Sequence, residues 1–445
     1  MNVILIIVDG LRPDHLGING YKRDTSPTID KIAKKSIFFT NAITAIPSTT
    51  PSVASMFTGL YPHSHGLRFM HRHKLDPKVT TLAEILHAHG YKTIGYDLDS
   101  IGDGIDKGFD AFSLLRWKIS NKLKRTIKKF FYWKYSIGQA EELTITAKKQ
   151  IKKYKNKKFF LYLHYEDMHW PYKPPIPFGD IFDPDYEGNH IFNDWNGKIK
   201  RKDLIFNNTL PKEEIYHAIA HYDGSIKYID SQINGLVSYL DYLKLKDKTL
   251  IIIVADHGEN LGEHNLYFQH SLCLYEEAIR VPLIIYNPNF EKAQKIETQV
   301  QTIDIMPTIL DILGIPSVEK TDGESLLPLI RTGKSDRKYL FAENGELLFR
   351  DNNRTFFAGI KGKWRMIRTN EWKLIYIHHP EKDIYELYDL LNDPNEGTNL
   401  ISRKPEIASM LKEKLFKWIE SSKEDKDMDL TERSKRLLRK LGYME

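Results

Sequence analysis

The chain has 445 residues, of which 41% are hydrophobic and 12% aromatic, so it can bury a large core and is not expected to be disordered. No apolar stretch approaches the roughly 20 residues that a membrane span requires, and the single cysteine, Cys273, excludes an internal disulfide framework. The net charge of +6 suits an anionic substrate but by itself gives no ground for a nucleic-acid partner.

The first predicted element is the apolar segment Val3–Val8, which Asp9 and Gly10 end abruptly. This segment is too short for the hydrophobic region of a secretory signal, and it lacks a charged start and a small-residue cleavage site. We therefore expect a buried strand here and a cytoplasmic protein.

Four more apolar segments have the length and composition of buried strands. They are Lys92–Tyr96, Phe159–His164, Leu250–Val254 and Val281–Tyr286. The patterns typical of helices are Thr28–Lys35, Thr81–His89, Ile215–Leu240 and 304–314. This alternation predicts an α/β fold with a mainly parallel sheet and helices on both faces. Ligands of such sheets gather at the carboxyl ends of the strands, where we place Asp9, His164–His169 and Asp256.

The segment Arg116–Lys134 carries eight lysines or arginines and no acidic residue, with aromatic and aliphatic residues between them. It could make a peripheral contact with an anionic membrane surface. A solvated helix that packs its apolar side on the domain explains the same pattern. Both interpretations stay open, and the sequence does not predict the oligomeric state.

From about residue 337 the pattern changes to shorter segments separated by turn-forming residues. The predicted strands of this region are Tyr339–Glu343, Thr355–Ile360, Trp364–Arg368, Lys373–Ile377 and Glu386–Asp389. They indicate a small antiparallel sheet, and a helix is expected at 404–421. We divide the chain into a larger α/β domain at 1–335, where any site at the strand ends would lie, a C-terminal α+β subdomain at 336–421 and a charged tail at 422–445.

Two acidic residues stand at the ends of predicted strands. Asp9 ends the first strand, and Asp256, with His257 beside it, ends the strand that begins at Leu250. Carboxylates at the exits of buried strands are costly unless they are paired, hydrogen-bonded or bound to a cation. One such aspartate alone would more commonly cap a helix, but the adjacent histidine favours a divalent metal ion.

The segment that contains Thr49 has residues that favour a reactive hydroxyl at the start of a helix. Pro51 is typical of a first helical turn, which places Thr49 or Thr50 where unpaired backbone amides point outward. An alkoxide or a bound oxyanion is favoured at that end of a helix, and a nearby metal ion would lower the pKa of the hydroxyl further. Alone, the pattern more commonly indicates a helix cap.

With these residues in view, the chain resembles the sulfatase family of the alkaline phosphatase superfamily, from Asn2 to about Leu400. Each matching segment is weak alone, but their order along the chain is specific. The segments are 8–17 (VDGLRPDHLG), 49–66, 164–172 (HYEDMHWPY), 256–264 (DHGENLGEH), 274–282 (LYEEAIRVP), 304–308 (DIMPT) and 386–390 (ELYDL). The resemblance implies an alkaline-phosphatase-like three-layer sandwich, with the small antiparallel sheet in a C-terminal subdomain.

The resemblance also implies roles for the residues at the strand ends. Asp9, Asp256 and His257 would hold the metal ion. Thr49 would be both the nucleophile and a further ligand of that ion.

Other residues of the matching segments would bind or protonate the substrate. His169 would contact the substrate or protonate the leaving group, His270 would be a basic catalytic residue, and Tyr172 would contribute to the substrate pocket. A second metal ion, as in phosphodiesterase relatives, would take Asp167, His169 and His270 as ligands. A substrate-binding His169 explains the same spacing equally well.

The chain departs from sulfatases at several positions. Sulfatases carry a cysteine or serine, oxidised to formylglycine, where this chain has Thr49, and an arginine where it has Val53. Threonine could be oxidised only to a ketone, so the aldehyde-hydrate mechanism is closed to it. Gly10 replaces a second acidic ligand, and His257 replaces an asparagine that suits calcium. The resulting donor set favours manganese or zinc, with magnesium or calcium as alternatives.

These departures move the expected substrate from sulfate towards phosphate. The leading hypothesis is a metal-dependent hydrolase of a small anionic ester, a phosphate mono- or diester, in which Thr49 forms a phosphothreonine that water then cleaves. Three alternatives stay open: hydrolysis of a sulfate ester, transfer of a phosphoryl group to another alcohol, and an inactive scaffold at a membrane surface.

Overall fold

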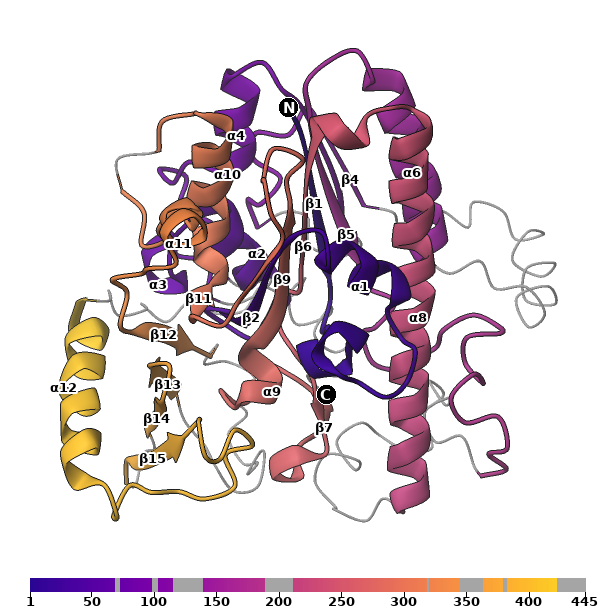
Figure 1. Cartoon of the computed structure of the whole chain (residues 1–445). Helices are drawn as coiled ribbons and strands as arrows, with labels where there is room; N and C mark the ends of the chain where they lie inside the picture. The colour runs from indigo at the N-terminus through magenta and orange to yellow at the C-terminus, as the bar shows by residue number, and fades with distance from the viewer. Residues whose placement is uncertain are drawn as a thin grey trace.

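The computed structural model describes residues 1–68, 73–97, 103–114, 139–188, 211–317, 320–344, 363–378 and 382–421. A central sheet with helices on both faces forms the larger part, and a smaller sheet covered by one helix lies beside it (Figure 1). The predicted segments Arg116–Lys134, Thr355–Ile360 and 422–445 lie outside the described residues. Within the described ranges, no helix is both long and apolar enough to span a membrane.

In the described part of the chain, the central sheet has nine strands, eight of them in the order β10-β2-β9-β6-β1-β5-β3-β4, and β11 pairs with β2. Their bounds are β1 Asn2–Val8, β2 Ile37–Ile43, β3 Lys92–Asp97, β4 Ala111–Leu114, β5 Phe159–Tyr165, β6 Thr249–Val254, β9 Arg280–Tyr286, β10 Gln294–Ile296 and β11 Val300–Gln301. Only β9 runs antiparallel to its neighbours among these strands. The prediction of a mainly parallel sheet is confirmed.

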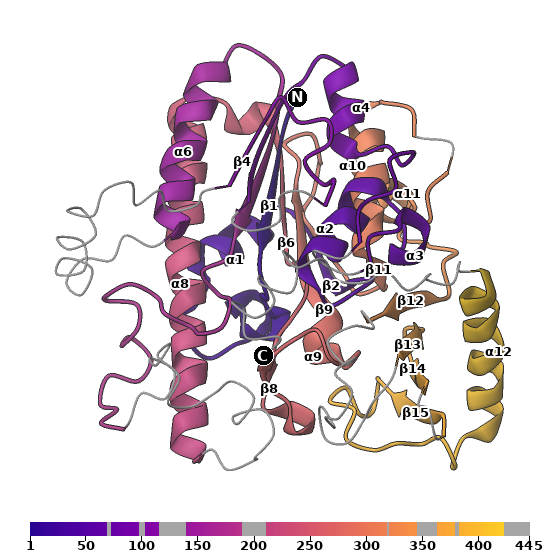
Figure 2. The same cartoon turned by 180° about the vertical axis from the view of Figure 1, so that it is seen from behind.

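Helices cover both faces of this sheet, as Figures 1 and 2 show. One layer contains α1 Pro27–Ala33, α6 Gln139–Tyr154 and α8 Lys212–Tyr242. The other contains α2 Thr49–Thr58, α4 Leu82–Ala88 and α10 Ile305–Leu313, with the short α3 Pro62–His65 and α11 Leu327–Thr332 beside them. Because both faces are covered, the central strand β1 is buried along its whole length, which is why it reads as a continuous apolar run.

Two of the longer elements of this fold, α6 and β2, are not evident from the sequence pattern. Small or polar residues, among them Ala140, Thr144 and Ala147, hold buried positions of α6, so its apolar stripe is weak. Thr40 and Asn41 interrupt the apolar run of β2, and the pairing of β2 with β9 shifts register at the same place. The alternation of patterns therefore predicts the layers but not every element in them.

The C-terminal region forms an antiparallel sheet, of which the described residues contain four strands in the order β12-β13-β14-β15. The elements are β12 Leu340–Glu343, β13 Lys363–Arg368, β14 Trp372–His378, β15 Ile384–Asp389 and the helix α12 Pro405–Ser421. One face of the sheet packs on Leu266, Leu274 and Ile279 of the larger part, and the other face packs on α12. The expected antiparallel sheet is confirmed, whereas the domain boundaries stay predictions.

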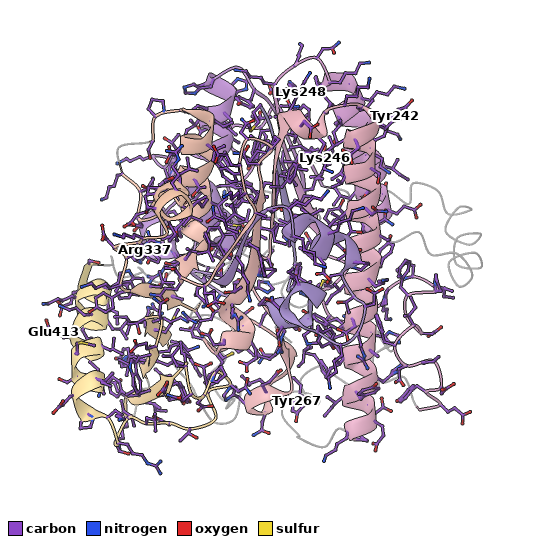
Figure 3. All side chains as sticks on the ribbon, viewed as in Figure 1. Tyr242, Lys246, Lys248, Tyr267, Arg337 and Glu413 are labelled. Carbon is purple, nitrogen blue, oxygen red and sulfur yellow. The ribbon has the colours of Figure 1, made fainter. Side chains whose placement is uncertain are left out.

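Arg337 joins the two parts just after the predicted boundary at residue 335. Its Nη1 donates to both carboxylate oxygens of Asp304, at 2.7 and 2.8 Å, where α10 begins. Figure 3 shows Arg337 where the helices of the larger part meet the C-terminal sheet. The pairing holds the segment that leads into β12 against the larger part.

A buried ion-pair cluster makes a second link between the two parts. Glu343 of β12 lies 2.7 Å from Arg68 and 3.2 Å from Arg365, and all three side chains are nearly inaccessible to solvent. The backbone N–H of Glu343 also donates to Ala45 O at 3.0 Å. Burial alone would raise the pKa of Glu343, but the two guanidinium groups outweigh it and lower the pKa to about 2.

Replacement of Glu343 by alanine is expected to lower the free energy of unfolding by about 3 to 5 kcal/mol, because two buried guanidinium groups lose their counter-charge. Urea denaturation at neutral pH measures this loss. Since folding lowers the pKa of Glu343 from 4.5 to about 2, the wild-type stabilisation is present above about pH 4.5 and is lost as the pH falls towards 2. Identical urea midpoints for wild type and Glu343→Ala at neutral pH would contradict this account.

Candidate active site

The candidate site lies at the carboxyl ends of three adjacent parallel strands. β1 lies between β5 and β6. Asp9 directly follows β1, Asp256 and His257 lie just beyond β6, and His164 is the next-to-last residue of β5. One ligand atom from each of Asp9, His164 and Asp256 lies within 4.8 Å of the other two. The sheet order thus gathers side chains that are far apart in the sequence.

Thr49 reaches this group from the first turn of α2, which also contains Pro51. The Ser52 hydroxyl in the same turn donates to Asp256 O at 2.7 Å and so holds the start of the helix against the end of β6. As a result Thr49 Oγ1 lies 3.1 Å from His257 Nε2, while the threonine stays partly exposed. The nucleophile hypothesis depends on this convergence, and the structure contains it.

His257 is held in one orientation and one tautomer. Its Nδ1 lies 2.9 Å from Gly258 O, and because a carbonyl oxygen can only accept, Nδ1 carries the hydrogen. In the neutral ring Nε2 therefore presents a lone pair, 3.3 Å from Asp256 Oδ2 and 4.0 Å from Asp9 Oδ1. A neutral imidazole whose other nitrogen donates to the main chain is the form that binds metal ions.

Asp256 has one oxygen in hydrogen bonds and one without a partner. Oδ1 accepts from Gly10 N at 3.2 Å and from His257 N at 3.0 Å. Gly10 adopts a φ of 64°, which favours glycine and directs its N–H to this oxygen. Oδ2 is buried and has no hydrogen-bond partner. An unpaired buried carboxylate oxygen is costly, so Oδ2 is suited to a cation.

The carboxyl group of Asp9 is destabilised in its charged form by burial and by the other acids near it. Its pKa is raised well above the usual value, first by burial and then by the carboxylates of Asp256, Glu259 and Asp97. A divalent cation offsets such a concentration of negative charge. The distances of 3.1 to 4.0 Å between His257 Nε2 and its oxygen neighbours are close to those between two ligands of one divalent ion. The residues therefore fit a divalent metal ion.

Glu259 positions a second group of side chains beside the first. Its Oε2 lies 2.9 Å from His270 Nδ1, and its Oε1 accepts from the Tyr172 hydroxyl at 2.8 Å. A carboxylate at Nδ1 fixes the imidazole and stabilises its protonated form, as an acid catalyst or an anion contact requires. The His270 ring stacks on the His257 ring, with centroids 3.8 Å apart. Tyr172 is fully buried behind Glu259, so its substrate contact stays a prediction.

His169 lies next to His270 at this edge of the sheet and is half-buried. The two ring centroids are 5.8 Å apart in an edge-to-face arrangement. His169 Nδ1 lies 2.8 Å from Trp170 O, and this carbonyl partner places the hydrogen on Nδ1. Thr49, His257, His270 and His169 thus form a continuous series that could contact one small substrate.

The predicted second metal site is not supported by the geometry. Asp167 accepts hydrogen bonds from the backbone N–H groups of Gln139 and Ala140, where α6 begins, and so acts as a helix cap. Burial outweighs these hydrogen bonds and raises the pKa of Asp167 to about 7. Within the described ranges, Asp167, His169 and His270 do not bring three ligand atoms within 4.8 Å of one another.

Two models of known protein families match this chain. The model of the sulfatase family matches residues 1–315, which is more than half of the chain, and the model of the C-terminal region of N-sulphoglucosamine sulphohydrolase matches residues 262–422. The chain belongs to the sulfatase family. The class expected from the sequence, an ester hydrolase of this family, is confirmed.

Two arylsulfatases and one solved structure are similar to this chain along most of their length. Arylsulfatase K of Bos taurus is 27% identical over 451 residues, which cover 93% of this chain and 81% of that protein. An arylsulfatase of Clostridium perfringens is 27% identical and is covered to 95%, as is this chain. The solved structure of the phosphonate monoester hydrolase of Agrobacterium radiobacter matches with a TM-score of 0.74 at 21% identity, covering 97% of this chain and 98% of that one. The last similarity shows a common fold.

The sequence assigns no role to two residues of this sulfatase-family site. His164 Nε2 lies 3.7 Å from Asp256 Oδ2, and its available signal was a histidine at the exit of an apolar strand. Glu259 orients His270 and Tyr172, and its available signal was its place three residues after Asp256. The role of His164 depends on Asp256, and that of Glu259 on His270 and Tyr172, and these partners come from other segments of the chain.

Replacement of Glu259 by glutamine is expected to lower kcat/KM by about 10- to 100-fold, less than loss of the acid itself, because protonated His270 loses its counter-charge. Steady-state kinetics with the best ester found for wild type measures the effect. Glu386→Gln is a matched control, since Glu386 also accepts from a buried tyrosine hydroxyl, that of Tyr275 at 3.1 Å, but lies in β15. Equal losses in the two variants would contradict a positioning role for Glu259.

Proposed function

We propose that this chain hydrolyses a sulfate ester at a divalent metal ion, with the Thr49 hydroxyl as nucleophile. The observation that carries the proposal is the position of Thr49 Oγ1, 3.1 Å from His257 Nε2, a nitrogen that itself lies 3.3 Å from Asp256 Oδ2 and 4.0 Å from Asp9 Oδ1. The match to the sulfatase family, and the similarity to curated arylsulfatases over 93–95% of the chain, support sulfate ahead of phosphate.

The metal ion would be held by Asp9, Asp256, His257 and Thr49. When bound, it supplies positive charge that offsets negative charge on the nucleophile and on a non-bridging oxygen of the ester. Two carboxylates, an imidazole and a hydroxyl favour manganese or zinc over calcium.

The side chains divide the remaining chemistry between them. Thr49 Oγ1 attacks sulfur, and because the threonine is partly exposed, its proton can pass to water. The backbone amides at the start of α2 favour the negative charge that this step brings. His270, oriented by Glu259, donates a proton to the leaving oxygen and afterwards takes one from the water that cleaves the threonine sulfate. His169, beside His270, contacts the ester.

A threonine nucleophile makes the second step the slower one. Thr49 cannot become an aldehyde hydrate, so sulfate leaves only when water attacks the sulfur of the threonine sulfate. We therefore expect a rapid burst of leaving group, close to one equivalent per active site, followed by slower turnover.

A phosphate mono- or diester, or a phosphonate monoester, is the second candidate substrate, and Thr49 is the observation that favours it. Water can cleave a phosphothreonine in an ordinary second in-line displacement, which avoids the slow step described for sulfate. The shared fold with a phosphonate monoester hydrolase is compatible with this chemistry.

Hydrolysis of matched esters tests both candidates. Protein purified without chelator and supplied with manganese or zinc is given nitrophenyl sulfate, nitrophenyl phosphate, its diester and a nitrophenyl phosphonate, with Thr49→Ala as control. Turnover of the sulfate above the control supports the proposal, and turnover of the phosphorus esters alone selects the second candidate. If wild type and Thr49→Ala are equally inert on every ester, both candidates fail and the scaffold hypothesis gains.

A further inference from the structure

We propose that His164 is a further ligand of the metal ion, held in position by Asp97 and Tyr162. The inference rests on the metal site of the proposed function and adds to it a residue to which neither the sequence pattern nor the comparisons give a role. The two nitrogens of the His164 ring face two different groups, Asp256 at Nε2 and Tyr162 at Nδ1.

Nε2 of His164 faces the end of β6. It lies 3.7 Å from Asp256 Oδ2, and both atoms are buried without a hydrogen-bond partner. Together with an oxygen of Asp9, these two atoms form one of the groups in the described residues whose ligand atoms all lie within 4.8 Å. A separation of 3.7 Å is too long for a hydrogen bond but close to the spacing of two ligands on one ion.

The Nδ1 side of the ring decides the tautomer. The Tyr162 hydroxyl donates its one hydrogen to Asp97 Oδ2 at 3.0 Å, so at His164 Nδ1, 3.2 Å away, it can only accept. Asp97 Oδ2 lies 3.5 Å from the same nitrogen and is also an acceptor. Nδ1 therefore carries a hydrogen, and in the neutral ring Nε2 presents a lone pair towards Asp256.

Two electron-rich atoms that face each other in a buried place are unfavourable unless a positive charge lies between them. A proton on Nε2 would leave the gap of 3.7 Å to Oδ2 without a hydrogen bond, although Asp97 and Asp256 outweigh burial and raise the pKa of His164. A metal ion meets the requirement and uses both atoms at once. Metal-binding histidines characteristically donate from their other nitrogen to a carboxylate or a similar partner, which fixes the ring and makes the ligand more basic. Asp97 and Tyr162 provide that partner for His164.

The position of His164 also explains how the site accommodates Gly10, where sulfatases commonly have a second acidic ligand. β5 pairs with β1, with His164 opposite Ile7, so its imidazole enters the site from the neighbouring strand. Gly10 instead adopts a φ of 64°, which favours glycine, and in this conformation its N–H donates to Asp256 Oδ1. An imidazole from β5 thus takes the place of the carboxylate that β1 lacks.

Metal affinity, measured separately from activity, tests this inference. Apo protein is titrated with zinc or manganese by calorimetry, and the visible spectrum of the cobalt-loaded protein reports the ligands. We expect His164→Ala to raise the dissociation constant for the metal ion by about 100-fold or more and to change the visible absorption bands of bound cobalt. Tyr162→Phe, which removes only a partner of the ring, should weaken metal affinity by about 10- to 100-fold. Asp97→Asn should weaken it at least as much, since it also removes a negative charge that acts on Asp9.

His217→Ala is the matched control, because His217 is also buried and lies 2.9 Å from a carboxylate, that of Asp183, but belongs to α8. It should lose comparable stability and no metal affinity. Circular dichroism of the apo proteins establishes that each variant folds. If His164→Ala does not fold, Tyr162→Phe, which removes one hydroxyl, carries the test.

Wild-type affinity and an unchanged cobalt spectrum in folded His164→Ala would overturn the inference, as would wild-type affinity in Tyr162→Phe where that variant has to stand in. A wild-type protein that binds no divalent metal would overturn it together with the proposed function. If the wild type binds metal through His164 but hydrolyses none of the esters, the proposed function fails and the ligand assignment stands.

Discussion

Replacement of Thr49 by alanine is expected to lower kcat/KM for ester hydrolysis by about a thousandfold or more, because it removes the nucleophile. The oxygen that is lost lies 3.1 Å from His257 Nε2 at the start of α2. Since Thr49 is partly exposed, the free energy of unfolding should change by no more than about 1 kcal/mol. Steady-state kinetics and urea denaturation measure the two quantities on the same preparation.

Thr49→Ser is the matched control for this prediction. Serine keeps a hydroxyl at the start of α2, so its activity should stay within about tenfold of wild type. Mass spectrometry after rapid quenching should find the substrate's sulfate or phosphate group on residue 49 in wild type and in Thr49→Ser, and none in Thr49→Ala. A Thr49→Ala protein with wild-type kinetics would remove Thr49 from the mechanism.

Replacement of Asp256 by asparagine is expected to cause a loss of similar size through the metal ion. The side-chain oxygen of asparagine can still accept from Gly10 N and His257 N, as Asp256 Oδ1 does at 3.2 and 3.0 Å. The negative charge and the second oxygen, Oδ2, are lost. We expect kcat/KM to fall by about a thousandfold and the metal content after gel filtration to fall to near zero.

Asp230→Asn separates this effect from the general cost of replacing a buried aspartate. Asp230 accepts from Thr28 N and Ile29 N and so resembles Asp256 in its backbone contacts, but it caps α1. It should retain the full metal content and activity. Elemental analysis that finds one metal ion per chain in both variants would show that Asp256 is not a ligand.

The layers of this fold follow from local pattern, and the exceptions have local causes. β1, β5 and β6 are covered on both faces, so each appears in the sequence as a continuous apolar run. α6 is hidden because alanine and threonine occupy buried positions, and β2 is hidden because polar residues interrupt its run. Burial of such residues depends on the partner that covers them, and periodicity does not report the partner.

The sequence likewise identified only some of the residues of the candidate site correctly. Asp9, Thr49, Asp256 and His257 could be selected because each stands at an element end where its chemistry is unusual for its surroundings. Asp167 stands in a similar place but accepts from the amides of α6. A carboxylate at a strand exit has the same sequence signal whether it caps a helix or faces a metal ion, so the pattern cannot separate the two.

The sequence alone showed that Asp9, Asp256 and His257 follow buried strands and that the Thr49 hydroxyl begins a helix. Polar groups at such points can be recognised because their burial is costly unless they have a partner. The sequence could not show that His164 faces Asp256 or that Glu259 orients His270. Those contacts depend on which strand lies next to which, here β5 beside β1 beside β6, and on loops that return to the same edge of the sheet. Strand order is set by the packing of the whole core, to which every layer contributes and which no single segment encodes.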